Sequence, residues 1–203
     1  MEHADHVALI RNGIEERDRG GVWAELGSGS GAFTLALAEL LGPGAIIYSL
    51  DRDGRALREQ GRAMRTHFPD TTLHAITVDY TGPFPSDVPL FDGVLLANTL
   101  HIQPERERGQ VLDQLHAALR PGGRLIVVEY NTDRGNRWVP HPFSFPSWQR
   151  LAREHGFTDT RLLASRPSRF LGEIYAASST VSTEGTASVV ESAAAEHEQG
   201  NAG

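Results

Sequence analysis

A glycine-rich segment that directly follows a short apolar run constrains the fold of this chain more than any other feature. The run Val22–Leu26 is typical of a short buried strand, and it leads into Gly27-Ser28-Gly29-Ser30-Gly31. The next residues, 32–41, are rich in Ala and Leu and stop at Gly42-Pro43-Gly44, which is typical of a helix. The sequence therefore predicts a strand, a glycine turn and a helix in succession, an arrangement suited to binding a ligand against the backbone.

Strand and helix patterns alternate along the rest of the chain. The further strands are predicted at 45–50, 73–78, 91–97, 125–130, 159–165 and 170–177. The further helices are predicted at 3–19, at 54–67, from Pro104 onward, and near 145–155. The connection between the last two strands is so short that these strands must pair antiparallel. We therefore expect an α/β fold, with a mostly parallel sheet between two layers of helices.

Length and composition favour one domain. With 203 residues, 39% of them hydrophobic, the chain suits a single domain, which we place at 1–178 with helix 3–19 included. The segment 179–203 consists of Ser, Thr, Ala and Glu with almost no large apolar residue, so we expect it to be disordered. No run of 18 apolar residues is present, and the N-terminus lacks an apolar stretch, so we expect neither a membrane span nor a secretory signal.

The residue types that the chain lacks exclude several chemistries. It has no cysteine, which rules out disulfides, thiolate zinc sites and a cysteine nucleophile, and which fits a cytoplasmic protein. It has no lysine either, since all 19 basic residues are arginine, so Schiff-base chemistry is excluded. A net charge of −7 disfavours nucleic acid as a partner and favours a small substrate. The nine histidines are scattered, and no metal site is predicted.

Acidic residues lie at or near the ends of three of the predicted strands. Asp51 lies 20 residues after Gly31, where a carboxylate can accept both ribose hydroxyls of a nucleoside cofactor or, alternatively, cap the next helix. This position suits NAD and S-adenosylmethionine (SAM) equally. Asp79 is placed to accept an adenine amine, beside the backbone N–H of Tyr80. Glu25 would add negative charge that suits the cationic SAM and opposes a pyrophosphate, so SAM is favoured.

Residues 22–130 resemble the class I, Rossmann-like, SAM-dependent methyltransferases. Val22–Gly31 is similar to the first motif of that family, an acidic residue before Gly-x-Gly-x-Gly, and Asp51 and Val78-Asp79-Tyr80 match its ribose and adenine positions. Phe91–Asn98 and Leu119–Leu125 resemble its fourth-strand motif and its Leu-x-Pro-Gly-Gly turn. The resemblance implies a seven-stranded, mostly parallel sheet in a three-layer α/β/α sandwich, with an antiparallel last strand.

The resemblance also implies SAM as cofactor and S-adenosyl-L-homocysteine (SAH) as product. The predicted cofactor-binding residues are Glu25, Gly27, Ser28, Gly29, Gly31, Asp51, Arg52, Asp79, Tyr80 and Asn98. In that family, the segment that holds Asn98 borders the methionine end of SAM. The resemblance thus assigns the cofactor, while leaving the methyl acceptor unassigned.

His101 is the candidate general base, because a neutral imidazole near pH 7 can take a proton from a hydroxyl or an amine. A histidine that caps the next helix or faces solvent is the competing interpretation. The candidate substrate pocket comprises His6, Tyr130, Asn131, Trp138, His141 and Arg169. Its aromatic residues form a pocket wall or, alternatively, cover the edge of the sheet.

The sequence thus predicts a SAM-dependent methyltransferase that acts on a small-molecule acceptor. Two alternatives stay open at this point. One is a SAM-binding protein without catalytic activity. The other is a nicotinamide-dependent oxidoreductase, because Gly27, Gly29 and Ala32 also fit the dinucleotide pattern Gly-x-Gly-x-x-Ala.

Overall fold

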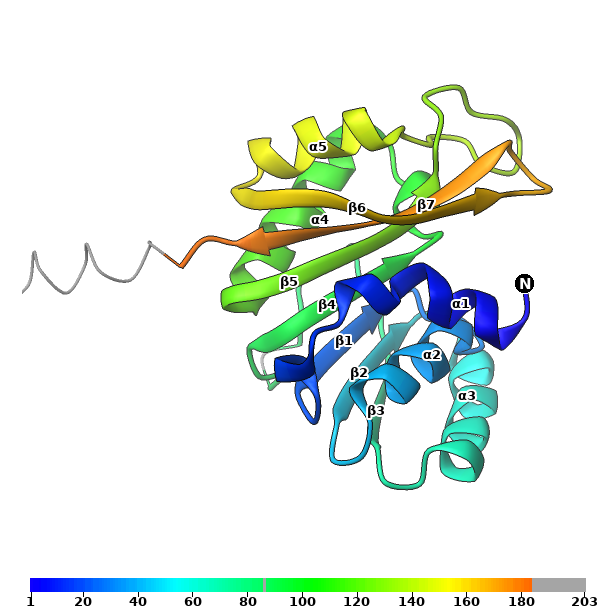
Figure 1. Cartoon of the computed structure of the whole chain (residues 1–203), viewed down its shortest axis with the longest axis vertical. Helices are drawn as coiled ribbons and strands as arrows, with labels where there is room; N and C mark the ends of the chain where they lie inside the picture. Colours follow the sequence, from blue (N-terminus) through cyan, green and yellow to red (C-terminus); the bar gives the residue numbers. More distant parts are fainter. Residues whose placement is uncertain (86, 184–203) are drawn as a thin grey trace, which may run out of the picture.

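The computed structural model describes residues 1–85 and 87–183, whose seven strands form one sheet (Figure 1). The strands are β1 (Val22–Leu26), β2 (Ile46–Asp51), β3 (Thr72–Thr77), β4 (Phe91–Ala97), β5 (Leu119–Tyr130), β6 (Phe157–Pro167) and β7 (Glu173–Val181). Their order across the sheet is β3-β2-β1-β4-β5-β7-β6. β7 pairs antiparallel with both β5 and β6, and the other neighbouring pairs are parallel. The predicted fold class is therefore confirmed.

Two layers of helices cover the sheet (Figure 1). The helices are α1 (His3–Ile10), α2 (Ala32–Leu41), α3 (Gly54–His67), α4 (Glu105–Ala118) and α5 (Phe145–Glu154). Successive strand residues face opposite sides. Leu95 of β4 packs with residues of α1, α2 and α3, whereas Val94 and Leu96 pack with residues of α4 and α5. The protein thus has two apolar layers, one on each side of the sheet.

The strand order reverses between β1 and β4, which lie side by side at the centre of the sheet. In an open parallel sheet, the segments that leave two such strands diverge to opposite faces and open a crevice at the carboxyl ends. The glycine turn follows β1, and Asn98 follows β4. The topology therefore places the predicted cofactor residues of these two strands at one crevice.

The N-terminal helix is shorter than predicted. α1 ends at Ile10, and two short 3₁₀ turns follow at Arg11–Gly13 and Glu16–Asp18. A Cβ atom on Gly13 would lie 2.7 Å from side-chain atoms of Ile126 and Leu163, so the backbone at this point rests directly against the sheet. The prediction of one helix over 3–19 is wrong beyond Ile10, because this close approach takes the place of further helical turns.

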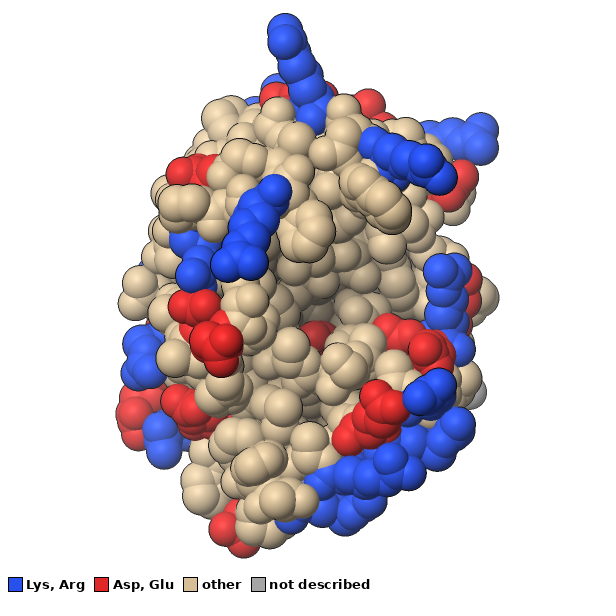
Figure 2. All heavy atoms as spheres, turned by 90° about the vertical axis from the view of Figure 1, so that its right-hand side faces the viewer, with Lys and Arg blue, Asp and Glu red and all other residues tan. Residues whose placement is uncertain are grey.

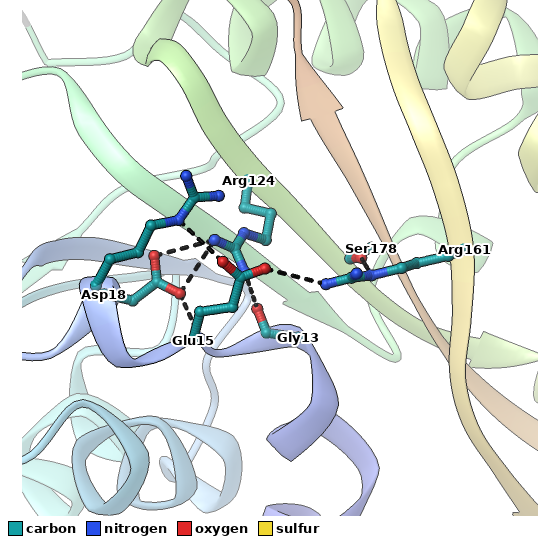
Figure 3. Close-up of polar contacts among 7 residues, drawn as sticks. Gly13, Glu15, Asp18, Arg124, Arg161 and Ser178 are labelled. Carbon is teal, nitrogen blue, oxygen red and sulfur yellow. Dashed lines mark hydrogen bonds and ion pairs between the residues drawn. The ribbon is translucent and has the colours of Figure 1, made fainter.

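A buried arginine holds this N-terminal segment to the sheet (Figure 3). Arg124 of β5 is 3% exposed, and its guanidinium donates to the carbonyl oxygen of Gly13 at 3.0 Å. The same group forms ion pairs with Glu15 at 3.0 Å and Asp18 at 3.2 Å, and Glu15 also meets Arg161 of β6 at 3.3 Å. Arg124 pairs with Gly93, near the amino end of β4, so these contacts position the segment after α1 from the end of the sheet opposite the crevice.

Strands β5, β6 and β7 extend beyond their predicted ends. β5 begins at Leu119, because Leu119 already pairs with Phe91 of β4, six residues before the predicted start of the strand. β7 continues to Val181, and Ser179 is fully buried between β5 and β6. The predicted boundary after residue 178 is therefore three residues too early. The remainder of the predicted disordered tail, from 184 onward, lies outside the described residues.

Candidate functional site

A pocket of about 350 Å³ lies at the carboxyl ends of β1 to β4. Figure 2 views the molecule from this side, and it shows a hollow near the centre of the face with acidic side chains close by. Residues from four loops line the pocket: Gly27, Gly29, Asp51, Arg52, Asp53, Ala56, Val78, Asp79, Tyr80, Asn98, Thr99, Ile102 and Gln103. Seven of the ten predicted cofactor residues are in this lining, and Glu25, Ser28 and Gly31 are not.

The three glycines of the turn serve different purposes. All three have positive φ angles, of 68° at Gly27, 53° at Gly29 and 91° at Gly31. A Cβ atom on Gly27 would collide with Thr99, and one on Gly31 would collide with the side chain of Gln60. A Cβ atom on Gly29 would meet nothing within 4 Å. Gly29 therefore leaves its space to the pocket, whereas Gly27 and Gly31 are needed for packing within the protein.

Asp51 joins the glycine turn to the start of α3. Its Oδ2 atom accepts the backbone N–H of Gly29 at 2.7 Å, and its Oδ1 atom accepts that of Asp53 at 2.8 Å. Each carboxylate oxygen has a further lone pair. Because Asp51 also lines the pocket, it combines a structural role in the turn with free acceptor capacity toward a ligand.

Asp79 and Tyr80 form another wall of the pocket, directly after β3. Oδ1 of Asp79 accepts both the hydroxyl of Thr81, at 2.7 Å, and its backbone N–H, at 3.0 Å. These two hydrogen bonds lower the pKa of the Asp79 carboxyl, so it is ionised near neutral pH. The hydroxyl of Tyr80 donates to the carbonyl oxygen of Thr99 at 3.0 Å, which ties this wall to the segment after β4.

Asn98 carries a buried acceptor that no other residue in the described part of the chain pairs with. Its φ angle is 55°, in the left-handed region, and its backbone N–H donates to the carbonyl oxygen of Val128 at 2.8 Å. The Oδ1 atom of Asn98 is buried, and it has no hydrogen-bond partner within the described residues. A buried polar atom that lacks a partner costs free energy unless a ligand or a water supplies the bond. Asn98 therefore fits a pocket that takes a polar ligand.

Glu25 is buried behind the pocket lining. Its side chain is 2% exposed, and its Oε2 atom accepts the hydroxyl of Thr34 from α2. Burial raises the pKa of Glu25 to about 8, although the bond from Thr34 opposes the rise, and the charge of Asp51 adds to it. The carboxyl of Glu25 is therefore mostly neutral at pH 7. Its predicted contact with the cofactor stays a prediction.

The catalytic candidate His101 belongs to a buried pair that the sequence analysis missed. Its Nδ1 atom lies 2.7 Å from Oε2 of Glu129, near the end of β5. Both side chains are buried, with 6% of His101 and 0% of Glu129 exposed. A carboxylate only accepts hydrogen bonds, so in the neutral imidazole this contact favours the tautomer with the proton on Nδ1 and the lone pair on Nε2. The one signal in the sequence was an acidic residue within an apolar strand.

The remaining candidate residues separate into neighbours of His101 and outer loop residues. Tyr130 packs edge-on against His101 with ring centroids 5.4 Å apart, and the backbone N–H of His141 donates to the carbonyl oxygen of His101 at 3.0 Å. Asn131 is occupied within the protein, because its amide donates to Glu173 at 2.7 Å. Trp138 is 77% exposed. The structure thus gathers Tyr130 and the backbone of His141 around the candidate base.

The other two candidates lie on different elements. His6 of α1 packs edge-on against Phe33 with ring centroids 4.8 Å apart, and burial lowers the pKa of His6. Arg169 is exposed in the turn between β6 and β7. The amide of Asn136 lies 3.5 Å from the carbonyl oxygen of Phe170, so this turn neighbours the loop of Trp138.

Residues 1–85 and 87–183 contain no group of three or more side chains suited to a metal ion. None of the helices in this part of the chain has the length and hydrophobicity that a membrane span requires.

Known proteins share both the sequence motifs and this architecture. A family model described as "Methyltransferase domain" matches residues 24–125, half of the chain. Acetylserotonin O-methyltransferase of Rattus norvegicus is 35% identical over 109 residues, which cover 53% of this chain and 24% of the rat protein. Arsenite methyltransferase of Aquipseudomonas alcaligenes is 23% identical over 160 residues, 70% of this chain and 46% of that protein. The chain spans about half or less of the length of these curated relatives.

Solved structures agree on the fold. A 1,6-didemethyltoxoflavin-N1-methyltransferase of Burkholderia thailandensis superposes with a TM-score of 0.66 and 20% identity, covering 89% of this chain and 78% of that one. A putative O-methyltransferase of Nostoc punctiforme reaches 0.68 with 20% identity, over 87% and 56% of the two chains. Motifs, pocket, topology and family model agree, and the chain belongs to the class I, Rossmann-like, SAM-dependent methyltransferases.

Proposed function

We propose that this protein transfers a methyl group from SAM to an oxygen or nitrogen atom of a small-molecule acceptor, with His101 as the general base. The observation that carries this proposal is the pair of His101 and Glu129 in the segment after β4. Thr99, Ile102 and Gln103 of that segment line the pocket. The base therefore lies in the same short turn as residues that would border the cofactor.

The pocket residues fit SAM in shape and in charge. The open space beside Gly29 admits a ligand against the glycine turn, and the unpartnered Oδ1 of Asn98 would accept a bond from the ligand's ammonium group. Asp51 would accept the ribose hydroxyls, and Asp79 would accept the adenine amine. Gly27, Arg52 and Tyr80 are the other proposed cofactor-binding residues that line the pocket, and Glu25, Ser28 and Gly31 remain proposed members of the set behind this lining. The bound cofactor supplies a methyl group made electrophilic by its sulfonium.

Proton transfer is the step that this chain performs with its own side chains. Glu129 favours the tautomer of the neutral imidazole with the proton on Nδ1, and in that tautomer Nε2 can take the acceptor's proton. The acceptor's lone pair would then be free to attack the methyl group that bound SAM supplies, with SAH as the leaving group. Tyr130 packs against the imidazole and limits its rotation. His6, Asn131, Trp138, His141 and Arg169 remain the proposed residues of the acceptor pocket and its rim.

A panel of phenols, amines and carboxylic acids tests the proposal through the release of SAH. The purified protein should first bind SAM and SAH in calorimetry while NADH gives no heat of binding. Binding of NADH alone would identify a nicotinamide-dependent enzyme. SAM binding without SAH release from any acceptor in the panel would instead favour a non-catalytic SAM-binding protein.

We also infer a cytoplasmic location, because the chain has no cysteine to stabilise it in an oxidising compartment.

A further inference from the structure

A chain of hydrogen bonds between buried side chains runs beneath the glycine turn. The hydroxyl of Ser28 lies 2.6 Å from that of Ser49, on β2, and Ser49 donates to Oε1 of Gln60, on α3, at 2.8 Å. Nε2 of Gln60 donates to the hydroxyl of Thr34, on α2, and Thr34 donates to Glu25, on β1. Every member is less than 10% exposed. This chain of hydrogen bonds therefore links the glycine turn to Glu25 through three elements of the fold, β2, α3 and α2.

The hydrogen bonds in this chain have one direction. A hydroxyl has one proton to donate. Because Ser49 donates its proton to Gln60, Ser28 must be the donor in its hydrogen bond with Ser49. Gln60 donates to Thr34, which leaves the proton of Thr34 for Glu25. All the donors thus point toward the carboxyl of Glu25, and this arrangement supports its ionised form. Gln60 accepts from Ser49 with Oε1 and donates to Thr34 with Nε2, so its amide connects the two halves of this chain of hydrogen bonds.

Gln60 also sets the geometry of the turn. A Cβ atom on Gly31 would collide with the Gln60 side chain, so the amide packs directly under the start of α2. Gln60 is fully buried, whereas its neighbours Arg58 and Glu59 on α3 are exposed. A buried amide carries a desolvation cost, which its two hydrogen bonds offset.

We infer that Gln60 is a positioning residue for cofactor binding, because it orients Thr34 toward Glu25 and joins that carboxyl to the glycine turn. This inference rests on the proposed function, in which the ligand carries positive charge. The other charged group that acts on Glu25 is Asp51 of β2, and its negative charge opposes ionisation. A cationic ligand favours the ionised form of Glu25. The chain of donors then holds the carboxylate in place as the ligand binds.

The inference predicts a specific dependence of cofactor affinity on pH. Burial raises the pKa of Glu25 to about 8 in the free protein, so the affinity for a cation should increase from pH 6 toward pH 8.5 as Glu25 ionises. Gln60→Leu removes the donor that orients Thr34, and the pKa of Glu25 should then rise further. The midpoint of the pH dependence should move upward, and the affinity at pH 7 should fall about tenfold.

Calorimetric titration with SAM, whose sulfonium gives it a net positive charge, between pH 6 and 8.5 is the experiment, with Gln149→Leu, at an exposed position on α5, as the matched control. Ser49→Ala is the milder second variant, and it should move the midpoint in the same direction by less. A Gln60→Leu protein that is weakened by the same factor at every pH would overturn the inference, because a purely structural role predicts that result. Should wild type fail to bind SAM, the proposed function itself falls, and this inference falls with it.

Discussion

Nδ1 of His101 lies 2.7 Å from Oε2 of Glu129, while Oε1 of the same carboxylate accepts three consecutive backbone N–H groups, those of Thr99, Leu100 and His101. One buried carboxylate therefore fixes both the backbone turn and the tautomer of the imidazole. The arrangement explains why a charged residue is found inside the otherwise apolar strand β5. Because Glu129 contacts His101 directly, a substitution of Glu129 can test whether His101 is the base.

Glu129→Gln should lower the rate of methyl transfer about 10²- to 10⁴-fold while leaving the affinity for SAH nearly unchanged. The amide oxygen can still accept from the backbone, but its NH₂ group would donate to Nδ1 of His101 and shift the imidazole proton to Nε2. SAH release with an active acceptor gives the rate, and calorimetry gives the affinity. His155 and Asp113 form a similar pair on the surface at 2.6 Å, so Asp113→Asn is the matched control. Equal rates in Glu129→Gln and wild type would remove His101 as the base.

Gly29→Val should abolish cofactor binding, because the new side chain would occupy the open space of the pocket. The φ angle of 53° adds strain that any non-glycine residue would bear. Gly44 provides the control, since its φ angle is 81°, it also has open space around it, and it lies outside the pocket lining. Gly44→Val should lose stability and keep its affinity for SAM. Both affinities are measurable by calorimetry, and intact binding in Gly29→Val would place the ligand elsewhere.

Asp51→Ala should weaken SAM binding by about 1.5–3 kcal/mol, the usual contribution of hydrogen bonds to a charged acceptor. The structure adds a second consequence, because Asp51 also holds the backbone N–H of Gly29 and of Asp53. The melting temperature of the free protein should therefore fall as well. Asp70→Ala, at an exposed position before β3, is the control for both measurements. An unchanged affinity for SAM would contradict the ribose assignment.

The sequence predicted best those elements whose signals are local. α2 and α3 have their predicted bounds, since glycine or proline residues limit the first and the Asp53 cap and a charged face define the second. Seven of the residues that line the pocket likewise belong to motifs at strand ends. Long-range contacts were not predictable: the break after Ile10 depends on Gly13 meeting β5 and β6, and the role of Glu129 depends on the turn after β4. Neither contact produces a periodic pattern of residues in the amino-acid sequence.

The end of β7 sets how far the chain can be shortened. A protein that ends at Thr183 should keep the melting temperature of the full chain. One that ends at Ser178 should melt markedly lower, because it loses the pairing of Ser179 and Thr180 with β5 and of Val181 with Phe157. Thermal unfolding of both versions decides this. A large loss of stability in the longer version would show that residues after 183 contribute to the fold.

Arg124→Met should destabilise the protein by about 3–5 kcal/mol, because it leaves Asp18 buried without its cation and removes the donor to Gly13. Arg161→Met, which breaks an exposed contact with the same Glu15, should cost about 1 kcal/mol or less. Urea unfolding measures both. The cluster lies at the opposite end of the sheet from the pocket, so SAM affinity of the folded Arg124→Met protein should change little. A tenfold loss of affinity would mean that the N-terminal segment carries strain from this cluster to the site.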